Sequence, residues 1–284
     1  MAEIIVLANE KGGVGKTTTT AHFGVEVSRK FNARVLLVDL DPQGNLTKTL
    51  VGDLAAGAQT IYHVLAGVAS LADIAFRIEE TEQGGVVDIL PANRGLSGLE
   101  KALSNDMNQH FKLREVLKPV ADLYDYILID CQASQGLGTV NAFCAADKLL
   151  IPVQCEFYAM EGVAMFAQSI EEVRKFLNPS LVVCGVLPVR FKKNYRINRD
   201  VVDKLTELSG ELVFSTPIRD TTKLSESPSY QQTVFDYAPR TAGADDYKDA
   251  AEEFVARCSN GNNFEELTQN FLTNCEEERT ERGM

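Results

Sequence analysis

The sequence predicts a single α/β domain with a mostly parallel, twisted β-sheet and helices on both faces. Three observations support this prediction. Short apolar runs rich in β-branched residues alternate with segments of helical periodicity, as they do in βαβ units. The apolar runs are nearly unbroken, which is typical of parallel strands buried on both faces. The 284 residues, 45% of them hydrophobic, suffice for one compact core.

The predicted strands are apolar runs of five to seven residues, and the predicted helices occupy the intervals between them. In chain order, the strands are Glu3–Ala8, Arg34–Leu40, Val86–Leu90, Tyr126–Asp130, Lys148–Val153, Leu181–Leu187 and Leu212–Thr216. The main helices are Lys16–Lys30, Thr139–Ala146, Met160–Phe176, Arg199–Ser209 and Ala244–Arg257, followed by one more at about Phe264–Glu278. We expect the domain to cover residues 1–258, with a linker at Ser259–Asn263 and an acidic helical extension over residues 259–284.

Composition favours a cytoplasmic protein with reduced cysteines. Residues 1–9 lack the features of a signal peptide, and no apolar run approaches the ~18 residues that a membrane helix needs. The six cysteines show no CxxC spacing, and several lie in apolar runs, so we expect buried thiols rather than metal ligands or disulfides. The formal net charge of −12 by itself argues against nucleic-acid binding.

A phosphate-binding loop follows the first predicted strand directly. The segment from Asn9 reads NEKGGVGKTT and leads into a helix. Glycines allow successive backbone N–H groups to surround phosphate oxygens, and the helix N-terminus adds a favourable dipole. In such a P-loop NTPase, Lys16 would reach the β- and γ-phosphates of ATP, and the Thr17 hydroxyl would bind Mg²⁺. The predicted cofactor-binding residues are Lys11, Gly12, Gly13, Val14, Gly15, Lys16, Thr17 and Thr18.

Acidic residues end two of the predicted strands. Asp39 and Asp41 stand two positions apart, which places both on one face of the second strand. Asp130 ends the apolar strand YILID, the pattern of a Walker B motif that holds Mg²⁺. Because the carboxyl ends of parallel strands meet at one edge of a sheet, we expect these carboxylates beside the phosphate loop.

The loop departs from the ordinary P-loop pattern in an informative way. Glu10 stands where GxxxxGK[ST] has its first glycine, and a second lysine, Lys11, follows it. The segment KGGVGKT resembles the deviant Walker A loop of the ParA/MinD superfamily. That resemblance implies a nucleotide-sandwich homodimer in which Lys11 reaches the partner's phosphates. It also implies that Asp41 positions the attacking water and that Asp39 organises magnesium-bound water. The expected catalytic residues are therefore Asp41, Lys11 and Lys16, and the expected metal-site residues are Thr17, Asp39 and Asp130.

The resemblance covers about residues 3–258 and is strongest to plasmid and chromosome partition ATPases. Similar segments include DLDPQGN from Asp39, LPAN from Leu90, LIPV from Leu150 and KLSESPS from Lys223. Two segments differ from the family pattern. After Asp130 the chain has CQAS where the family usually has Pro-Pro-Ser, and IRDT from Ile218 replaces Ile-Pro-Arg-Asn, so the adenine contacts stay unassigned.

One basic segment favours DNA as a partner despite the negative net charge. The run from Arg190 to Arg199 holds five bases and no acid, and we expect Arg219 to lie near it. Two copies on one face of a dimer would bind DNA without sequence preference. The predicted DNA-binding residues are Arg190, Lys192, Lys193, Arg196, Arg199 and Arg219. The predicted function is therefore partition or positioning of plasmid or chromosome cargo by a nucleoid-associated ATPase, stimulated by a ParB-like or other cargo adaptor.

Three other functions fit the sequence less well or share its features. A ParA-like ATPase that positions a protein cargo would use nearly every one of the same residues. A MinD-like membrane ATPase needs a basic amphipathic helix, whereas the apolar stripe of Phe264, Leu267, Phe271 and Leu272 has acidic neighbours. We therefore expect no membrane partner, and we expect the C-terminal helix to be docked on the domain or to form a surface for a protein partner. An iron–sulfur reductase like the nitrogenase iron protein needs cysteines beyond the switch loops, and Cys131 adjoins Asp130 instead.

Overall fold

The computed structural model describes residues 1–134, 136–259 and 263–283. Over these residues it contains one seven-stranded sheet with the order β3-β4-β2-β5-β1-β6-β7. The strands are β1 (Glu3–Leu7), β2 (Arg34–Leu40), β3 (Phe76–Glu80), β4 (Val86–Leu90), β5 (Tyr126–Cys131), β6 (Lys148–Gln154) and β7 (Val182–Val189). Every pairing is parallel except that of β3 with β4. The predicted α/β class with a mostly parallel sheet is confirmed.

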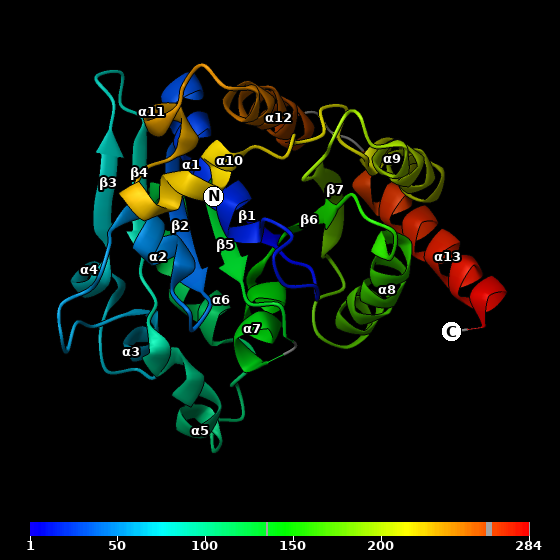
Figure 1. Ribbon diagram of the computed structural model, residues 1–284. Coiled ribbons are helices and arrows are strands. Elements are labelled where there is room, and N and C mark those ends of the chain that lie inside the picture. Colours follow the sequence, from blue (N-terminus) through cyan, green and yellow to red (C-terminus); the bar gives the residue numbers. More distant parts are fainter. Residues whose placement is uncertain (135, 260–262, 284) are drawn as a thin grey trace.

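Helices cover both faces of the sheet (Figure 1). They are α1 (Lys16–Phe31), α2 (Asn45–Leu50), α3 (Ile61–Leu65), α4 (Leu71–Ile74), α5 (Leu99–Leu103), α6 (Lys112–Leu117), α7 (Leu137–Ala145), α8 (Ala159–Phe176), α9 (Arg196–Ser209), α10 (Thr222–Glu226), α11 (Val234–Tyr237), α12 (Ala242–Ser259) and α13 (Phe264–Arg282). In Figure 1, α12 lies above the sheet while α7 and α8 lie below it. Short 3-10 helices occupy Arg94–Gly98, Lys118–Leu123, Gly210–Leu212 and Ser227–Tyr230.

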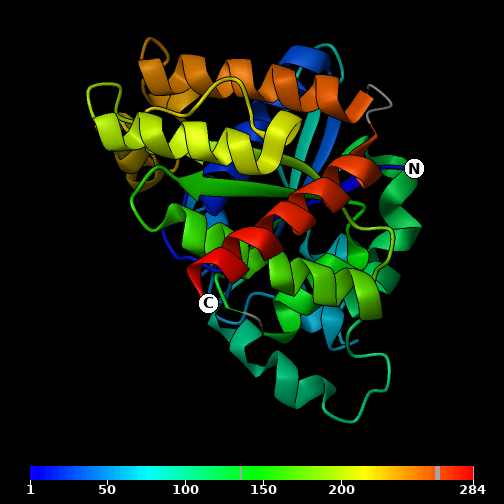
Figure 2. The same cartoon turned by 90° about the vertical axis from the view of Figure 1, so that its right-hand side faces the viewer.

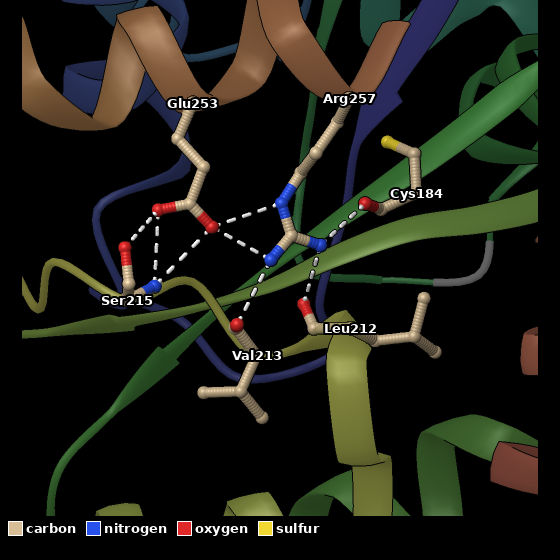
Figure 3. A network of polar contacts seen from close by, with 6 residues as sticks. All are labelled: Cys184, Leu212, Val213, Ser215, Glu253 and Arg257. Atoms are coloured by element: carbon tan, nitrogen blue, oxygen red, sulfur yellow. Dashed lines mark hydrogen bonds and ion pairs between the residues drawn. The ribbon is translucent and has the colours of Figure 1, made fainter. Parts of the chain in front are cut away.

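The predicted seventh strand, Leu212–Thr216, is wrong. This segment starts in a 3-10 helix and then pairs with β7 at a single bridge, Val186 with Val213. The reason is the side chain of Arg257 on α12, which donates to the carbonyl oxygens of Cys184, Leu212 and Val213 at 3.2, 3.2 and 2.9 Å (Figure 3). A guanidinium therefore satisfies the carbonyls that a neighbouring strand would otherwise bind.

The strand that completes the seven-stranded sheet is β3, which was not predicted from the sequence. Its residues FRIEE are mostly charged or exposed, and the strand pairs antiparallel with β4 at the edge of the sheet. Charged side chains on an edge strand oppose pairing with other chains, and they also hide the apolar pattern that identifies a strand. Two predicted helices also shift: α9 begins at Arg196 rather than Arg199, and α7 begins at Leu137 rather than Thr139.

The C-terminal helix α13 lies across the opposite edge of the sheet. Figure 2 shows it running diagonally between α9 and α8, beside β7. Its apolar stripe is turned inward, with Phe264, Phe271 and Leu272 all buried. The hydroxyl of Thr268, itself fully buried, accepts a hydrogen bond from the backbone N–H of Val183 on β7 at 2.8 Å. The helix thus covers an edge strand that would otherwise expose unpaired backbone groups.

The expected docking of this helix agrees with the structure. Of the predicted linker Ser259–Asn263, Ser259 ends α12, while residues 260–262 lie outside the described part of the chain. Throughout the described residues, no helix is both long and apolar enough to cross a lipid bilayer. All six cysteines are buried and unpaired, as expected.

Candidate nucleotide-binding and hydrolysis site

The phosphate loop connects β1, a central strand of the sheet, to the N-terminus of α1. Gly13 and Gly15 adopt left-handed backbone conformations, with φ of 74° and 80°. Residues other than glycine rarely adopt these backbone angles, so the two glycines of the local sequence determine the shape of the turn. No side chain caps α1, whose N-cap residue is Gly15. The first N–H groups of the helix are therefore available to an anion.

Lys16 is buried at the base of this loop, with 7% of its surface exposed. Its Nζ donates to the backbone carbonyl oxygens of Asn9 and Lys11 at 3.1 and 3.2 Å. Burial lowers the pKa of Lys16, and the charge of Asp130 acts in the opposite direction. A buried ammonium whose partners are neutral carbonyls is a strong binding group for a phosphate.

Asp130 and Thr17 are joined by a hydrogen bond at the end of β5, where the sequence predicts a magnesium site. Asp39 and Asp130 are register partners on the adjacent strands β2 and β5. Thr17 donates from its hydroxyl to Oδ2 of Asp130 at 2.7 Å, while Oδ1 is buried and has no hydrogen-bond partner within the described residues. Burial, reinforced by the charge of Asp39, raises the pKa of Asp130 well above its ordinary value. An orphaned, buried carboxylate oxygen beside a threonine hydroxyl fits a cation.

The donor set fits magnesium that arrives with a nucleotide. In the described part of the chain, no group of three or more His, Cys, Asp or Glu side chains could hold a metal ion by itself. Magnesium in nucleotide sites takes few protein ligands, because phosphate and water complete its coordination shell. Thr17 and Asp130 are the residues that would hold it.

Asp39 and Asp41 have different environments. The carboxylate of Asp39 is fully buried and accepts hydrogen bonds from the Thr47 N–H at 2.9 Å, the Thr47 hydroxyl at 2.7 Å and the Asp41 N–H at 3.1 Å. Burial raises the pKa of Asp39 to about 6, against the effect of these hydrogen bonds. Asp41 instead lines the cavity and accepts from the Gln43 N–H at 2.8 Å. Asp39 therefore anchors the turn that presents Asp41.

A cavity of about 410 Å³ opens above the phosphate loop. One wall is the loop itself, with Gly12, Gly13 and residues 15–18. The opposite wall comes from residues 218–221 and from Leu224, Ser225 and Pro228. The remaining lining residues are Asp41, Asn45, Cys131, Ala133, Val189, Arg190 and Tyr247. Of the predicted loop residues, Lys11 and Val14 do not line the cavity, and Val14 is buried. The cavity is large enough for a nucleotide whose phosphates lie on the loop.

A buried cluster that was not predicted from the sequence supports the cavity. His22 on α1 contacts the Thr18 carbonyl through Nδ1 at 2.6 Å, and its Nε2 accepts from the Val234 N–H at 2.9 Å. Burial lowers the pKa of His22 to about 4. Its ring stacks on Tyr247 with centroids 4.6 Å apart, and the Tyr247 hydroxyl lies 3.1 Å from that of Thr19. The cluster ties α1 to α11 and α12. Nothing in the local sequence distinguishes His22 from an ordinary core residue.

The segment after Asp130 begins with a residue that is still part of the sheet. Cys131 continues β5 by one residue beyond the predicted end of the strand, which a proline in its place would disfavour. Burial raises the pKa of its thiol well above the ordinary value. The thiol is therefore a neutral wall of the cavity rather than a reactive group.

The basic segment lies beside the cavity, and several of its charges already have partners. Phe191 bridges to Arg219, which brings residues 190–192 next to residues 218–220 as expected. Arg219 pairs with the buried carboxylate of Asp246 at 2.5 Å. Two further pairs, Lys192 with Asp220 at 3.2 Å and Arg196 with Asp200 at 3.7 Å, also neutralise bases in this segment. The other three predicted residues, Arg190, Lys193 and Arg199, are exposed, and Arg190 also lines the nucleotide cavity.

Lys11 differs from Lys16 although both belong to one loop. Its side chain is 41% exposed and forms an ion pair with Glu156 in the connection between β6 and α8. The structure thus separates the two lysines: Lys16 is buried under the loop, and Lys11 is paired with Glu156 and does not line the chain's own cavity.

Known proteins share both the sequence and the fold of this chain. A family model described as an AAA domain matches residues 2–183. The sporulation initiation inhibitor protein Soj of Bacillus subtilis is 38% identical over 253 residues, which are 89% of this chain and 98% of Soj. The chromosome partitioning protein ParA of Caulobacter vibrioides is 36% identical over 252 residues, 88% of this chain and 92% of ParA.

A solved structure supports the same assignment. Cobyrinic acid a,c-diamide synthase from Mycobacterium smegmatis, with a bound ATP analogue and magnesium, matches with a TM-score of 0.80 and 30% sequence identity. The match covers 93% of this chain and 98% of that one. These similarities confirm the resemblance inferred from the phosphate loop. The chain belongs to the AAA-domain family of P-loop ATPases that includes Soj and ParA.

Proposed function

We propose that this chain is an ATPase that dimerises with ATP, binds DNA without sequence preference and partitions or positions plasmid or chromosome cargo. A cargo-bound partner, such as a centromere-binding ParB-like protein, would stimulate hydrolysis, and the ATP-bound protein would associate with the nucleoid in the cytoplasm. The observation that carries the proposal is that the two lysines of the phosphate loop lie in different places: Lys16 is buried under the loop, and Lys11 is half-exposed outside the cavity. The partitioning role of relatives such as ParA supports the cargo part.

ATP would bind with its phosphates on the loop and its base toward the opposite wall. Lys16 and the open N–H groups of α1 would hold the phosphates, and Thr17 with Asp130 would hold Mg²⁺. When bound, magnesium neutralises phosphate charge as the bond to the leaving group breaks. The opposite wall offers Ile218 and Leu224 as apolar surface for the base, and Tyr247 also lines the cavity.

Asp41 is the residue best placed to orient an attacking water. It lines the cavity, and the Gln43 N–H donates to one of its oxygens at 2.8 Å, which fixes the carboxylate. Asp39 would act mainly through Asp41, because hydrogen bonds from Thr47 and from Asp41 itself occupy its own carboxylate. Any contribution of Asp39 to magnesium-bound water would be in addition to this structural role.

DNA binding would depend on dimerisation, which doubles the small number of unpaired basic residues that one protomer offers. In one protomer, acidic partners neutralise Lys192, Arg196 and Arg219, which leaves Arg190, Lys193 and Arg199 as candidate phosphate ligands. Three such residues on each protomer would contact about six phosphates in a dimer. The logarithm of the DNA-binding constant should then fall with the logarithm of the salt concentration with a slope of about −5. A monomer would have half that slope and bind weakly, so ATP-driven dimerisation would switch DNA binding on.

A second candidate is an ATPase that positions a protein cargo. The net charge of −12 and the ion pairs within the basic segment favour it, because they reduce the attraction to DNA. The phosphate loop, magnesium site and Asp41 would have the same roles in both functions. DNA binding is the property that separates them.

The decisive experiment uses an Asp41→Ala variant, which should bind ATP but hydrolyse it slowly and so accumulate as a dimer. Light scattering should show a dimer with ATP and a monomer with ADP. A 60-base-pair duplex added at low salt should bind in the presence of ATP and should not bind in the presence of ADP. Combining Lys193→Ala with Arg199→Ala should make the slope of the binding constant against salt shallower by about 3 or 4 units in the dimer. A variant that stays monomeric contradicts the dimer, and a dimer that ignores DNA contradicts the nucleoid role and favours a protein cargo.

A further inference from the structure

The exposed lysine of the phosphate loop is held by its own chain. Lys11 forms an ion pair with Glu156, and the side chains of the two residues are 41% and 37% exposed. Neither residue lines the nucleotide cavity. The lysine that the proposed function assigns to the partner's nucleotide therefore already has an acidic partner within the protomer.

The backbone around Glu156 is anchored on both sides. The Glu156 N–H donates to the Gln154 carbonyl at 2.8 Å, and the Glu156 carbonyl accepts from the Ala159 N–H at 3.0 Å at the start of α8. The preceding residue, Cys155, donates to the Val189 carbonyl at 3.0 Å and accepts from the side chain of Asn198. The backbone of Glu156 is thus held in a fixed position, from which its carboxylate reaches Lys11.

The phosphate loop is anchored independently of the ion pair. Asn9 donates from Nδ2 to the Pro152 carbonyl at 2.8 Å, in a buried contact, and its Oδ1 accepts from the Lys11 N–H at 3.0 Å. Ser169 on α8 donates to the Glu10 carboxylate at 2.6 Å. Because these contacts hold the backbone in place, opening the ion pair requires a rotation of the Lys11 side chain and no rearrangement of the loop.

We propose that Glu156 is a positioning residue that holds Lys11 in cis and thereby opposes dimerisation. This inference rests on the trans-acting role of Lys11 in the proposed function. In the dimer, Lys11 would exchange the single carboxylate of Glu156 for the phosphates of the partner's nucleotide, which carry more negative charge. ATP would then be needed both to build the interface and to draw the lysine away from its cis partner.

The size of the effect follows from the exposure of the pair and the symmetry of the dimer. A half-exposed ion pair typically favours the paired state by about 2- to 5-fold. Each protomer must open its own pair before a symmetric dimer forms, so the factor enters twice. Removing the Glu156 charge should therefore lower the dimer dissociation constant by about 4- to 25-fold.

The test compares Glu156→Gln with two matched variants in an Asp41→Ala background that prevents turnover. Glu156→Asp keeps the charge and should stay closer to the parent protein. Glu161→Gln removes a carboxylate from the first turn of α8 and should change dimerisation by less than about 2-fold. Sedimentation velocity over a concentration series with ATP gives the dissociation constants. Nucleotide titration at concentrations where the protein is monomeric should give the same ATP affinity for all variants.

Salt provides a second readout that loss of structure alone would not produce. Raising the ionic strength to 0.5 M screens an exposed pair, so the advantage of Glu156→Gln over the parent should shrink. A Glu156→Gln protein that dimerises as weakly as the parent, or more weakly, overturns the inference. An effect equally large for Glu161→Gln also overturns it, because general charge reduction would then be the cause.

A Lys11→Ala variant separates this inference from the proposed function. If Lys11→Ala dimerises normally with ATP, the trans-acting role of Lys11 is wrong and the proposed function fails with it. If Lys11→Ala stays monomeric while Glu156→Gln is no tighter than the parent, the trans role stands and only the restraint by Glu156 fails. The double variant should be as monomeric as Lys11→Ala, because Glu156 acts through Lys11.

Discussion

Replacing Lys16 by methionine tests the phosphate loop with a side chain of similar length and no charge. Lys16 is 7% exposed and donates to two backbone carbonyls at 3.1 and 3.2 Å. A charge-assisted hydrogen bond contributes roughly 1.5–3 kcal/mol, so losing two of them to phosphate weakens binding by about 3–6 kcal/mol. The ATP dissociation constant should therefore rise by roughly 10²- to 10⁴-fold.

The same variant should leave the fold nearly as stable. Burial lowers the pKa of Lys16, which means that the folded chain destabilises this ammonium relative to water. Removing the charge relieves that penalty and offsets the two lost hydrogen bonds, so the free energy of unfolding should change by no more than about 1 kcal/mol.

Two measurements check this prediction together. Calorimetric titration with ATP and magnesium gives the affinity, and urea unfolding gives the stability. The control is Lys48→Met on α2, since Lys48 is an exposed lysine that donates to the Gln43 carbonyl and does not line the nucleotide cavity. Near-normal ATP affinity in a folded Lys16→Met protein would refute the assignment of the loop. A large loss of stability would show that the variant disrupts the fold instead.

Two further predictions concern stability. The pKa of His22 is lowered to about 4 in the folded chain and is about 6.5 when unfolded, so its contribution is fully present above pH 6.5 and is lost as pH falls toward 4. Between pH 8 and pH 5 the free energy of unfolding, measured with urea, should fall by about 2 kcal/mol more for the wild type than for His22→Gln. Parallel pH profiles of this free energy would contradict the prediction. Arg257→Met should cost roughly 3–5 kcal/mol, because Glu253 and three carbonyls lose their partner. Arg34→Met opens an exposed pair with Asp125 and should cost much less than Arg257→Met, and equal losses would refute the role of Arg257.

The chemistry that lies within a few residues could be predicted directly. Gly13, Gly15, Lys16 and Thr17 are consecutive or nearly so, and the turn that they make depends on their own backbone angles. Asp41 and Asp130 could be placed beside them because they end parallel strands, whose carboxyl ends meet at one edge. The roles of these residues in hydrolysis stay predictions until the variants are measured.

The parts that could not be predicted depend on contacts between distant segments. Leu212–Thr216 has the composition of a strand, but Arg257, more than 40 residues later, takes its carbonyls. The opposite wall of the cavity comes from residues 218–221 and from Leu224, Ser225 and Pro228, whose sequence carries no phosphate-binding pattern. The basic run from Arg190 gave no indication that Asp220, which lies more than 20 residues later, would pair with Lys192.

The sequence by itself thus determined the class of fold, the phosphate loop and the family, because these depend on local backbone geometry and on the order of strands along the chain. Only the tertiary structure decided that Lys11 faces Glu156, that α13 covers the edge of β7, and that His22 joins α1 to α11. The physical reason is that a hydrogen bond or ion pair depends on the position of both partners. Packing of the whole core, rather than either local sequence, brings those partners together.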